Sequence, residues 1–138
     1  MSDHEALVDT DILSALMRRD LGAAGRARSY LNTHGHLTFS IITRYEILRG
    51  LKAKTATAQL ATFDVLCRAS AVLPLSDAVV ETASDVYAVL HRAGALVPDA
   101  DLLIASTALV HGLVVVTNNT SHFSRIPGLT VLNWLRPA

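Results

Sequence analysis

The sequence has few of the residues that cross-link a chain or carry it through a membrane. Its one cysteine, Cys67, excludes an internal disulfide and a zinc site built from several cysteines. No apolar run approaches the roughly 18 to 20 residues that span a bilayer. The start, residues 1–5, is acidic and lacks the basic segment that opens a signal peptide. We therefore expect a cytoplasmic protein without a membrane segment.

Charged residues are also scarce, at 17% of the chain against 51% apolar residues. This balance is typical of a globular protein and not of a disordered one. The 138 residues contain no repeat and no linker, so we expect a single domain over residues 1–138. The mean hydropathy of +0.36 is high for so short a chain. We therefore expect a second copy or a partner chain to cover part of the surface.

The net charge is zero, which by itself argues against a protein that binds nucleic acid. Residues 18–54, however, hold eight basic residues against Asp20 and Glu46. A local basic face can follow a phosphate backbone, although an ordinary solvated helix surface explains the charge equally well. The candidates for backbone contacts are Arg18, Arg19, Arg44, Arg49, Lys52 and Lys54.

Short apolar runs alternate with longer helical patterns along the whole chain. Strands are expected at residues 6–8, 37–40, 72–75, 113–116 and 130–133, and helices at 12–19, 23–32, 41–52, 55–69, 77–93 and 99–111. Ser76 is the expected N-cap of the helix that follows it, and Gly112 the expected end of the last helix. The alternation predicts an α/β fold with three layers, α/β/α, around a mostly parallel sheet of about five short strands.

Polar residues from four distant segments are expected at one edge of this sheet. In an open parallel sheet, ligands bind beyond the carboxyl ends of the strands. Two of the segments follow strands, one lies in the first two turns of a helix after a strand, and one opens a helix antiparallel to a strand. The residues are Asp9, Thr10 and Asp11; Glu46; Asp99 and Asp101; and Thr117, Asn118 and Asn119.

Crowded carboxylates repel one another, and a divalent cation removes that repulsion. A set of oxygen donors suits Mg²⁺ or Mn²⁺ better than Zn²⁺, and such an ion can activate water for attack on a phosphodiester. The six histidines, including His34 and His36, match no metal-ligand spacing and no catalytic-triad order. We interpret the histidines as structural or exposed.

Each of these polar residues also has a simpler structural interpretation. Asp9 and Asp11 can cap the helix that follows them, and for Asp99 an N-cap is the favoured interpretation. Asp101 can complement the helix dipole, and Glu46 can form an ion pair with Arg49. Asn118 and Asn119 can simply form a turn. The coincidence of all of them at one edge favours a functional site.

Four segments resemble, in order, the acidic-site motifs of PIN-domain nucleases. They are residues 8–13 (VDTDIL), 45–50 (YEILRG), 98–105 (PDADLLIA) and 116–120 (VTNNT). Residues 123–129 and the pair Asn133-Trp134 resemble the tail of VapC-type toxins from bacterial toxin–antitoxin pairs. The resemblance covers nearly the whole chain.

The resemblance implies that Asp9, Glu46 and Asp101 are catalytic and hold Mg²⁺ or Mn²⁺. Asn119 would help through its amide oxygen or through water, and Thr117 through its hydroxyl. Asp11 stands where relatives often have Asn or Ser, which leaves open whether it reaches the metal or only orders the loop. The resemblance also implies an RNA substrate, a homodimer, and a cognate antitoxin that inhibits by occupying the site.

Two other functions compete with this endoribonuclease hypothesis. Asp9-Thr10-Asp11 after a strand is similar to the nucleophile motif of haloacid-dehalogenase-type phosphohydrolases. That chemistry normally needs a lysine late in the chain, and the only lysines here, Lys52 and Lys54, lie in its middle. The second alternative is a catalytically inactive PIN fold that serves as a binding module.

Overall fold

The computed structural model describes residues 4–137, so the first three residues of the acidic start lie outside the described range. In chain order the elements are β1 (Ala6–Val8), α1 (Thr10–Met17), α2 (Leu21–His34), β2 (Thr38–Ser40), α3 (Ile41–Ala53), α4 (Thr57–Arg68), β3 (Ala71–Leu73), α5 (Asp77–Arg92), α6 (Asp99–His111), β4 (Val114–Val116), α7 (Thr120–Phe123) and β5 (Val131–Leu132). None of the described helices is long and apolar enough to cross a membrane.

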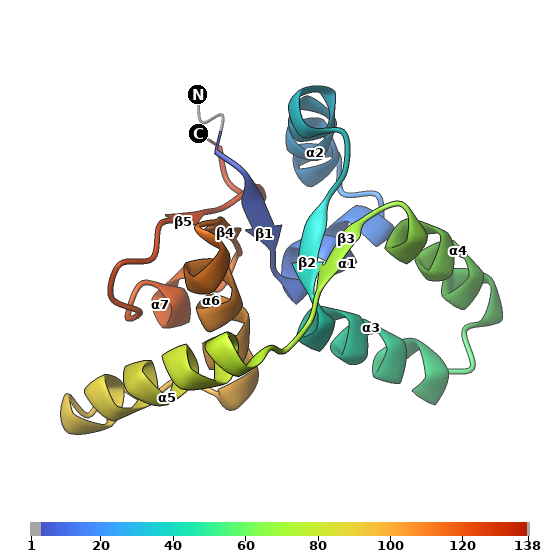
Figure 1. The fold of residues 1–138 in the computed structure, drawn as a ribbon. Coiled ribbons are helices and arrows are strands. Elements are labelled where there is room, and N and C mark those ends of the chain that lie inside the picture. Colours follow the sequence, from blue (N-terminus) through green and yellow to red (C-terminus); the bar gives the residue numbers. More distant parts are fainter. Residues whose placement is uncertain (1–3, 138) are drawn as a thin grey trace.

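The described strands form a parallel sheet interrupted at one point. β4 lies between β1 and β5, β2 pairs with β3, and each of these pairs is parallel. β1 and β2 are in contact, so the two sets of strands form one layer in the centre of the molecule (Figure 1). The predicted α/β class with about five short, mostly parallel strands is confirmed.

The side chains of the strands alternate between two separate apolar cores. Val8 and Val116 belong to a core that includes residues of α1, α2, α3 and α4, whereas Leu7 and Val115 belong to a core with residues of α5, α6 and α7. Successive side chains of a strand point to opposite faces, which produces this division. Because helices cover both faces, β1 and β4 are fully buried and read as unbroken apolar runs. The predicted three layers are therefore present.

Every predicted strand and helix is present, with boundaries that differ from the prediction by up to two residues, and one short helix was not predicted. Ser76 caps α5 by accepting a hydrogen bond from the Val79 N–H, and Gly112 ends α6 in the left-handed region at φ 66°. The helix expected from residue 55 begins at Thr57, because Thr55 itself adopts a left-handed φ of 53° between α3 and α4. α7 was not predicted, since four residues are too few to show a helical period.

The chain connections bring several helix starts to one edge of the sheet. α1 begins two residues after β1, α3 follows β2 directly, and α7 begins shortly after β4. α6 ends just before β4, and its first turn contacts α7 near the same edge through Asp101, Asn119 and His122. The polar residues that follow the strands therefore lie among the first turns of α1, α3, α6 and α7.

Candidate functional site

Asp9 lies at the centre of this edge and is 4% exposed. One carboxylate oxygen accepts a hydrogen bond from the Thr10 N–H at 2.8 Å, and the other accepts from the Thr117 hydroxyl at 2.7 Å. The first contact makes Asp9 the N-cap of α1, so the simple structural interpretation is correct for this residue. The second contact ties the end of β1 to the end of β4 and keeps the carboxylate at the site.

Glu46 reaches the edge from the middle of α3, where Thr10 Oγ1 lies 2.6 Å from its Oε1. Thr10 Oγ1 also lies 3.0 Å from Thr43 Oγ1. A hydroxyl has one proton and the carboxylate can only accept, so Thr10 donates to Glu46 and Thr43 donates to Thr10. The ion pair of Glu46 with Arg49 is longer, at 3.9 Å, and exposed on the arginine side. Thr10 therefore orients Glu46 more firmly than Arg49 does.

Thr43 is a buried member of this network that the sequence analysis did not identify. It is fully buried and lies one helical turn before Glu46 on α3. A threonine in phase with the buried Ile47 was the available signal, because a buried hydroxyl needs a hydrogen-bond partner.

Asp11 orders the loop after β4. Its Oδ2 accepts a hydrogen bond from the Asn118 N–H at 3.0 Å, while the Asn118 side chain accepts one from Asn133. Asp11 Oδ1 is buried and has no hydrogen-bond partner among the described residues. Buried polar atoms without a partner are uncommon, and a carboxylate oxygen of this kind is suited to bind a cation or water.

Asp101 lies in the first turn of α6 and contacts two residues of the loop and helix after β4. Its Oδ2 is 2.7 Å from His122 Nδ1 and 3.3 Å from Asn119 Nδ2. The Asn119 amide oxygen accepts from Ser121 at 3.3 Å. In this orientation Asn119 donates to Asp101 instead of presenting its oxygen as a ligand. Among the histidines, which the sequence analysis interpreted as structural or exposed, His122 is half-buried and contacts a predicted site residue.

The expectation that Asp99 caps α6 is wrong. The N-cap of α6 is Pro98, which makes no side-chain cap hydrogen bond, and Asp99 is the first residue of the helix. Asp99 is exposed, so its carboxylate complements the helix dipole from the solvent side. Asp101, two residues further on, is the acidic residue of this turn that meets the other polar groups.

The carboxylates influence one another electrostatically. Burial, together with the negative charges of Asp11 and Asp101, raises the pKa of Asp9 to about 7 against the lowering effect of its two hydrogen bonds. Burial also raises the pKa of Asp11, with a smaller contribution from Asp101. Three acidic groups from β1–α1 and α6 are thus close enough to oppose each other's ionisation.

The donor chemistry of this edge fits a hard divalent cation, although the ligands are not gathered around one point. Carboxylate oxygens predominate, Asp11 has an unpartnered buried oxygen, and the charge repulsion would be relieved by a cation. Within residues 4–137, no group of three acidic, histidine or cysteine side chains has the spacing of a metal site. The hydrogen bonds to Thr10, Thr117 and His122 hold the carboxylates individually.

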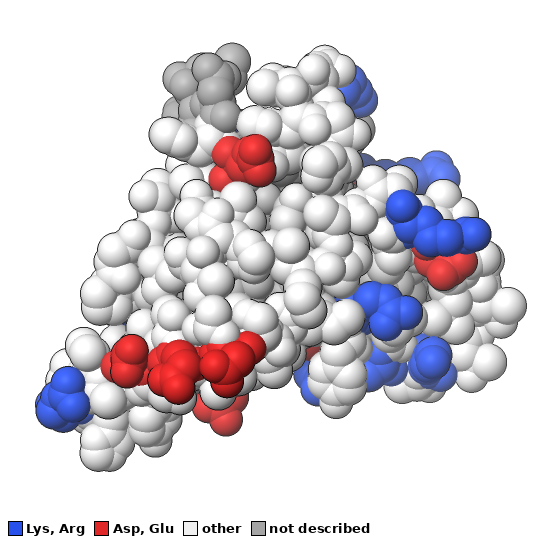
Figure 2. Space-filling model, in the orientation of Figure 1, with Lys and Arg blue, Asp and Glu red and all other residues white. Residues whose placement is uncertain are grey.

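The predicted backbone-binding residues lie on α3 and directly after α1, two of the helices that begin at this edge. Arg44, Arg49 and Lys52 belong to α3, Lys54 is its C-cap, and Arg18 and Arg19 follow α1. All are exposed except Arg44, which is half-buried beside Cys67 of α4. Figure 2 shows basic side chains over the α3–α4 side, and acidic side chains along α5.

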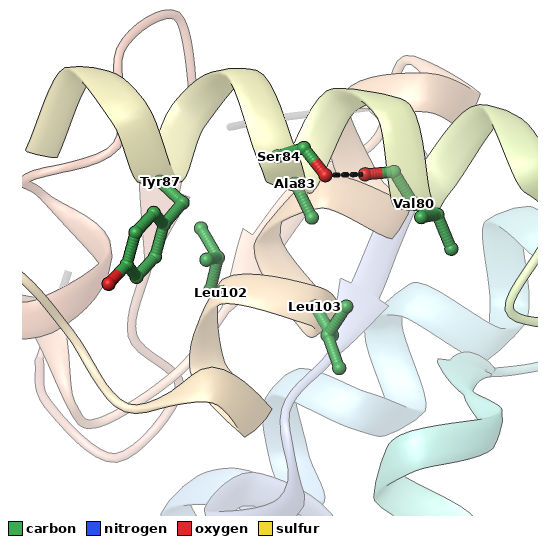
Figure 3. A pocket seen from close by; sticks show the side chains of 6 residues that line it. All are labelled: Val80, Ala83, Ser84, Tyr87, Leu102 and Leu103. Carbon is green, nitrogen blue, oxygen red and sulfur yellow. Dashed lines mark hydrogen bonds between the residues drawn. The ribbon is translucent and has the colours of Figure 1, made fainter. Parts of the chain in front are cut away.

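A shallow apolar groove of about 310 Å³ lies between α5 and α6. Val80, Ala83, Ser84 and Tyr87 line it from α5, with Leu102 and Leu103 from α6 (Figure 3). Val80 and Tyr87 are 45% and 43% exposed.

Comparisons with known proteins agree on one family. The PIN domain family matches residues 6–129. The DNA-bound VapBC structure from Salmonella typhimurium is similar at 30% identity and a TM-score of 0.82, over 95% of this chain and 98% of that chain. VapBC2 from Rickettsia felis, bound to a promoter DNA fragment, has 23% identity and a TM-score of 0.84 over 94% and 98% of the two chains. No curated protein matched the chain.

The raised pKa of Asp9 predicts how stability changes with pH in the metal-free protein. The folded state binds this proton more tightly than the unfolded state, so the contribution of Asp9 to stability is greatest at low pH and falls as the pH rises from about 4 through about 7. Asp9→Asn removes the charge, and we expect it to raise the free energy of unfolding at pH 8 by about 1 to 3 kcal/mol. Urea unfolding in EDTA at pH 5 and pH 8 measures both effects.

Asp99→Asn is the matched control, because this exposed carboxylate opens α6 outside the hydrogen-bonded cluster. We expect it to leave the pH dependence unchanged. An Asp9→Asn protein that loses as much stability as wild type between pH 5 and pH 8 would contradict the electrostatic account of the site.

Proposed function

Because this chain belongs to the PIN domain family of nucleases and is of the VapC type, we propose that it is a Mg²⁺- or Mn²⁺-dependent endoribonuclease, the toxin of a type II toxin–antitoxin pair. One observation carries the proposal: Asp9, Asp11 and Asp101 lie close together at the carboxyl edge of the sheet, where burial, followed by the charges of Asp11 and Asp101, raises the pKa of Asp9 to about 7. The family match removes the support for a haloacid-dehalogenase-type phosphohydrolase.

In the proposed mechanism, Asp9, Asp101 and Glu46 would hold the cation, and Asn119 would help by donating its amide hydrogen bond to Asp101. When bound, the cation supplies charge stabilisation at the scissile phosphate and makes water more acidic. Glu46 takes the proton of the attacking water, and Thr10 holds the accepting carboxylate in place through the 2.6 Å hydrogen bond. Thr117 fixes Asp9 in the same way from β4. Asp11 orders the loop that carries Asn118 and Asn119.

The proposed partners are an RNA substrate, a cognate antitoxin and a second copy of the chain. The similar solved structures from Salmonella typhimurium and Rickettsia felis are VapBC proteins, which supports an antitoxin for this chain. Exposed basic residues after α1 and on α3 would supply the surface for an RNA backbone. The location in the cytoplasm stays a prediction. The alternative is an inactive binding module, which would keep the fold and lack turnover.

The nuclease proposal predicts metal-dependent cleavage of RNA. We expect the protein to cut total RNA, candidate tRNAs or rRNA segments into fragments when Mg²⁺ or Mn²⁺ is present. With EDTA in place of the metal, we expect no fragments. Asp101→Asn should lower the rate at least about a hundredfold, because it removes a charge that holds the cation. Asp99→Asn, which changes an exposed acid in the same helical turn, should leave the rate nearly unchanged. Gel analysis of end-labelled RNA measures the cleavage.

Intact RNA in every metal condition, with folded protein, would favour the binding module. If Asp99→Asn and Asp101→Asn lowered the cleavage rate equally, the activity would not depend on the hydrogen-bonded cluster. That result would contradict the assignment of the site.

The basic surface predicts salt-dependent RNA binding through the end of α3. Lys52 and Lys54 are both exposed. The double variant Lys52→Gln/Lys54→Gln should weaken binding and lower the slope of log Kd against log salt by about 1.4, or about 0.7 for each lost phosphate contact. Fluorescence anisotropy with labelled single-stranded RNA in EDTA measures binding without cleavage. Arg92→Gln, on the distant end of α5, is the control and should keep the wild-type slope.

The apolar groove between α5 and α6 is the proposed dimer interface. Val80→Glu places a charge in this apolar groove, on the side of Leu103, so we expect it to convert a dimer into a monomer in sedimentation velocity. Val65→Glu is the matched control, because Val65 is 60% exposed on α4 and does not line the groove. A monomeric wild type, or dissociation by Val65→Glu alone, would rule out this interface.

A further inference from the structure

We propose that His122 is a positioning residue for Asp101, a role that rests on the proposed function of the site. Its Nδ1 lies 2.7 Å from Asp101 Oδ2, which makes this the shortest contact that Asp101 makes. His122 is 32% exposed at the side chain and Asp101 19%, so the contact is partly shielded from water. The imidazole thus holds the one acidic residue that α6 contributes to the cluster.

The surrounding atoms specify which ring nitrogen carries the proton. A carboxylate oxygen can only accept, so a contact of 2.7 Å requires a proton on Nδ1. Asn119 Nδ2 lies 2.7 Å from the same nitrogen and 3.3 Å from Asp101 Oδ2. The Asn119 amide nitrogen is itself a donor, so it cannot hydrogen-bond to a protonated Nδ1, and its acceptor is Asp101 Oδ2. Both neighbours then donate to the same carboxylate oxygen.

This arrangement fixes the direction of the second oxygen of Asp101. Among residues 4–137, the hydrogen bonds to Asp101 reach Oδ2, and Oδ1 receives none. Holding one oxygen of a planar carboxylate restricts its rotation about the last side-chain bond. Oδ1 is therefore already oriented before a cation binds, and binding costs little conformational freedom. A residue that hydrogen-bonds to a metal ligand usually contributes in this way.

The position of His122 is itself held by the core. Phe123, the next residue of α7, is 1% exposed and belongs to the core formed with α5 and α6. The Asn119 N–H donates to Thr117 Oγ1 at 2.9 Å, which fixes the start of the segment. His122 lies between these two fixed residues, Asn119 and Phe123. They hold its ring toward α6, although α7 is only four residues long.

The experiment compares two substitutions that differ in where they place a donor. The side-chain nitrogen of asparagine can occupy the position of Nδ1, so His122→Asn should keep Mn²⁺ affinity and cleavage rate within about threefold of wild type. His122→Leu keeps the bulk and removes the donor, and should weaken Mn²⁺ binding and cleavage about 10- to 100-fold. Calorimetric Mn²⁺ titration and RNA cleavage measure the two quantities. His36→Leu, in the exposed loop before β2, is the control.

A metal-free measurement tests the contact directly. The ¹⁵N chemical shifts of the His122 ring should show the Nδ1–H tautomer in wild type. In Asp101→Ala, Asn119 can donate to Nδ1, and the ring should change to the Nε2–H tautomer. An Nε2–H ring in wild type, or a His122→Leu protein with wild-type Mn²⁺ affinity, would overturn the proposal.

The design separates failure of this inference from failure of the proposed function. A wild type that neither binds Mn²⁺ nor cleaves RNA would overturn the proposed function and, with it, the role of His122 in catalysis. A wild type that does both, with His122→Asn and His122→Leu equally impaired and equally well folded by thermal unfolding, would overturn the positioning role alone.

Discussion

The parallel pairing of β1 with β4 is the constraint on which the site depends. Val8 pairs with Val116, so the next residues of the two strands, Asp9 and Thr117, leave the sheet side by side. The Asp9 N–H still donates to Val116 at 2.9 Å, and the Asp9 carboxylate accepts from Thr117 at 2.7 Å. The sheet therefore places a buried carboxylate where α1 begins, and the other acidic residues gather around it.

This arrangement opposes the stability of the protein. A buried carboxylate next to Asp11 and Asp101 resists ionisation, and the hydrogen bonds from Thr10 and Thr117 offset part of that cost. A site that binds a cation is expected to retain this repulsion between carboxylates. If the protein itself neutralised the carboxylates, the cation would gain less free energy on binding. The buried, unpartnered oxygen of Asp11 is a second example of the same compromise.

The fold and the edge that carries the site could be predicted from sequence because both follow from chain direction. The apolar runs at residues 6–8 and 113–116 specify buried parallel strands, and the polar residues after them must lie at one edge. The partners of each side chain could not be predicted in the same way. The contacts of His122 with Asp101 and of Thr43 with Thr10 depend on side-chain distances between elements, which periodicity does not encode. The cap of α6 depends on the backbone of Pro98, which excludes Asp99 from that position.

The sequence separation of the Asp9–Thr117 contact has a consequence for synthesis of the protein. The two residues lie 108 positions apart, and Asp101 and His122 also come from the last third of the chain. A nascent chain that ends before β4 has Asp9 and Glu46 but neither Thr117 nor the partners of Asp101. Contacts this distant in sequence form late, after nearly the whole domain is available. An incomplete translation product would therefore carry the acidic residues, Asp101 included, without Thr117 and His122 to hold them, so that the cell meets a potential toxin only as a finished domain.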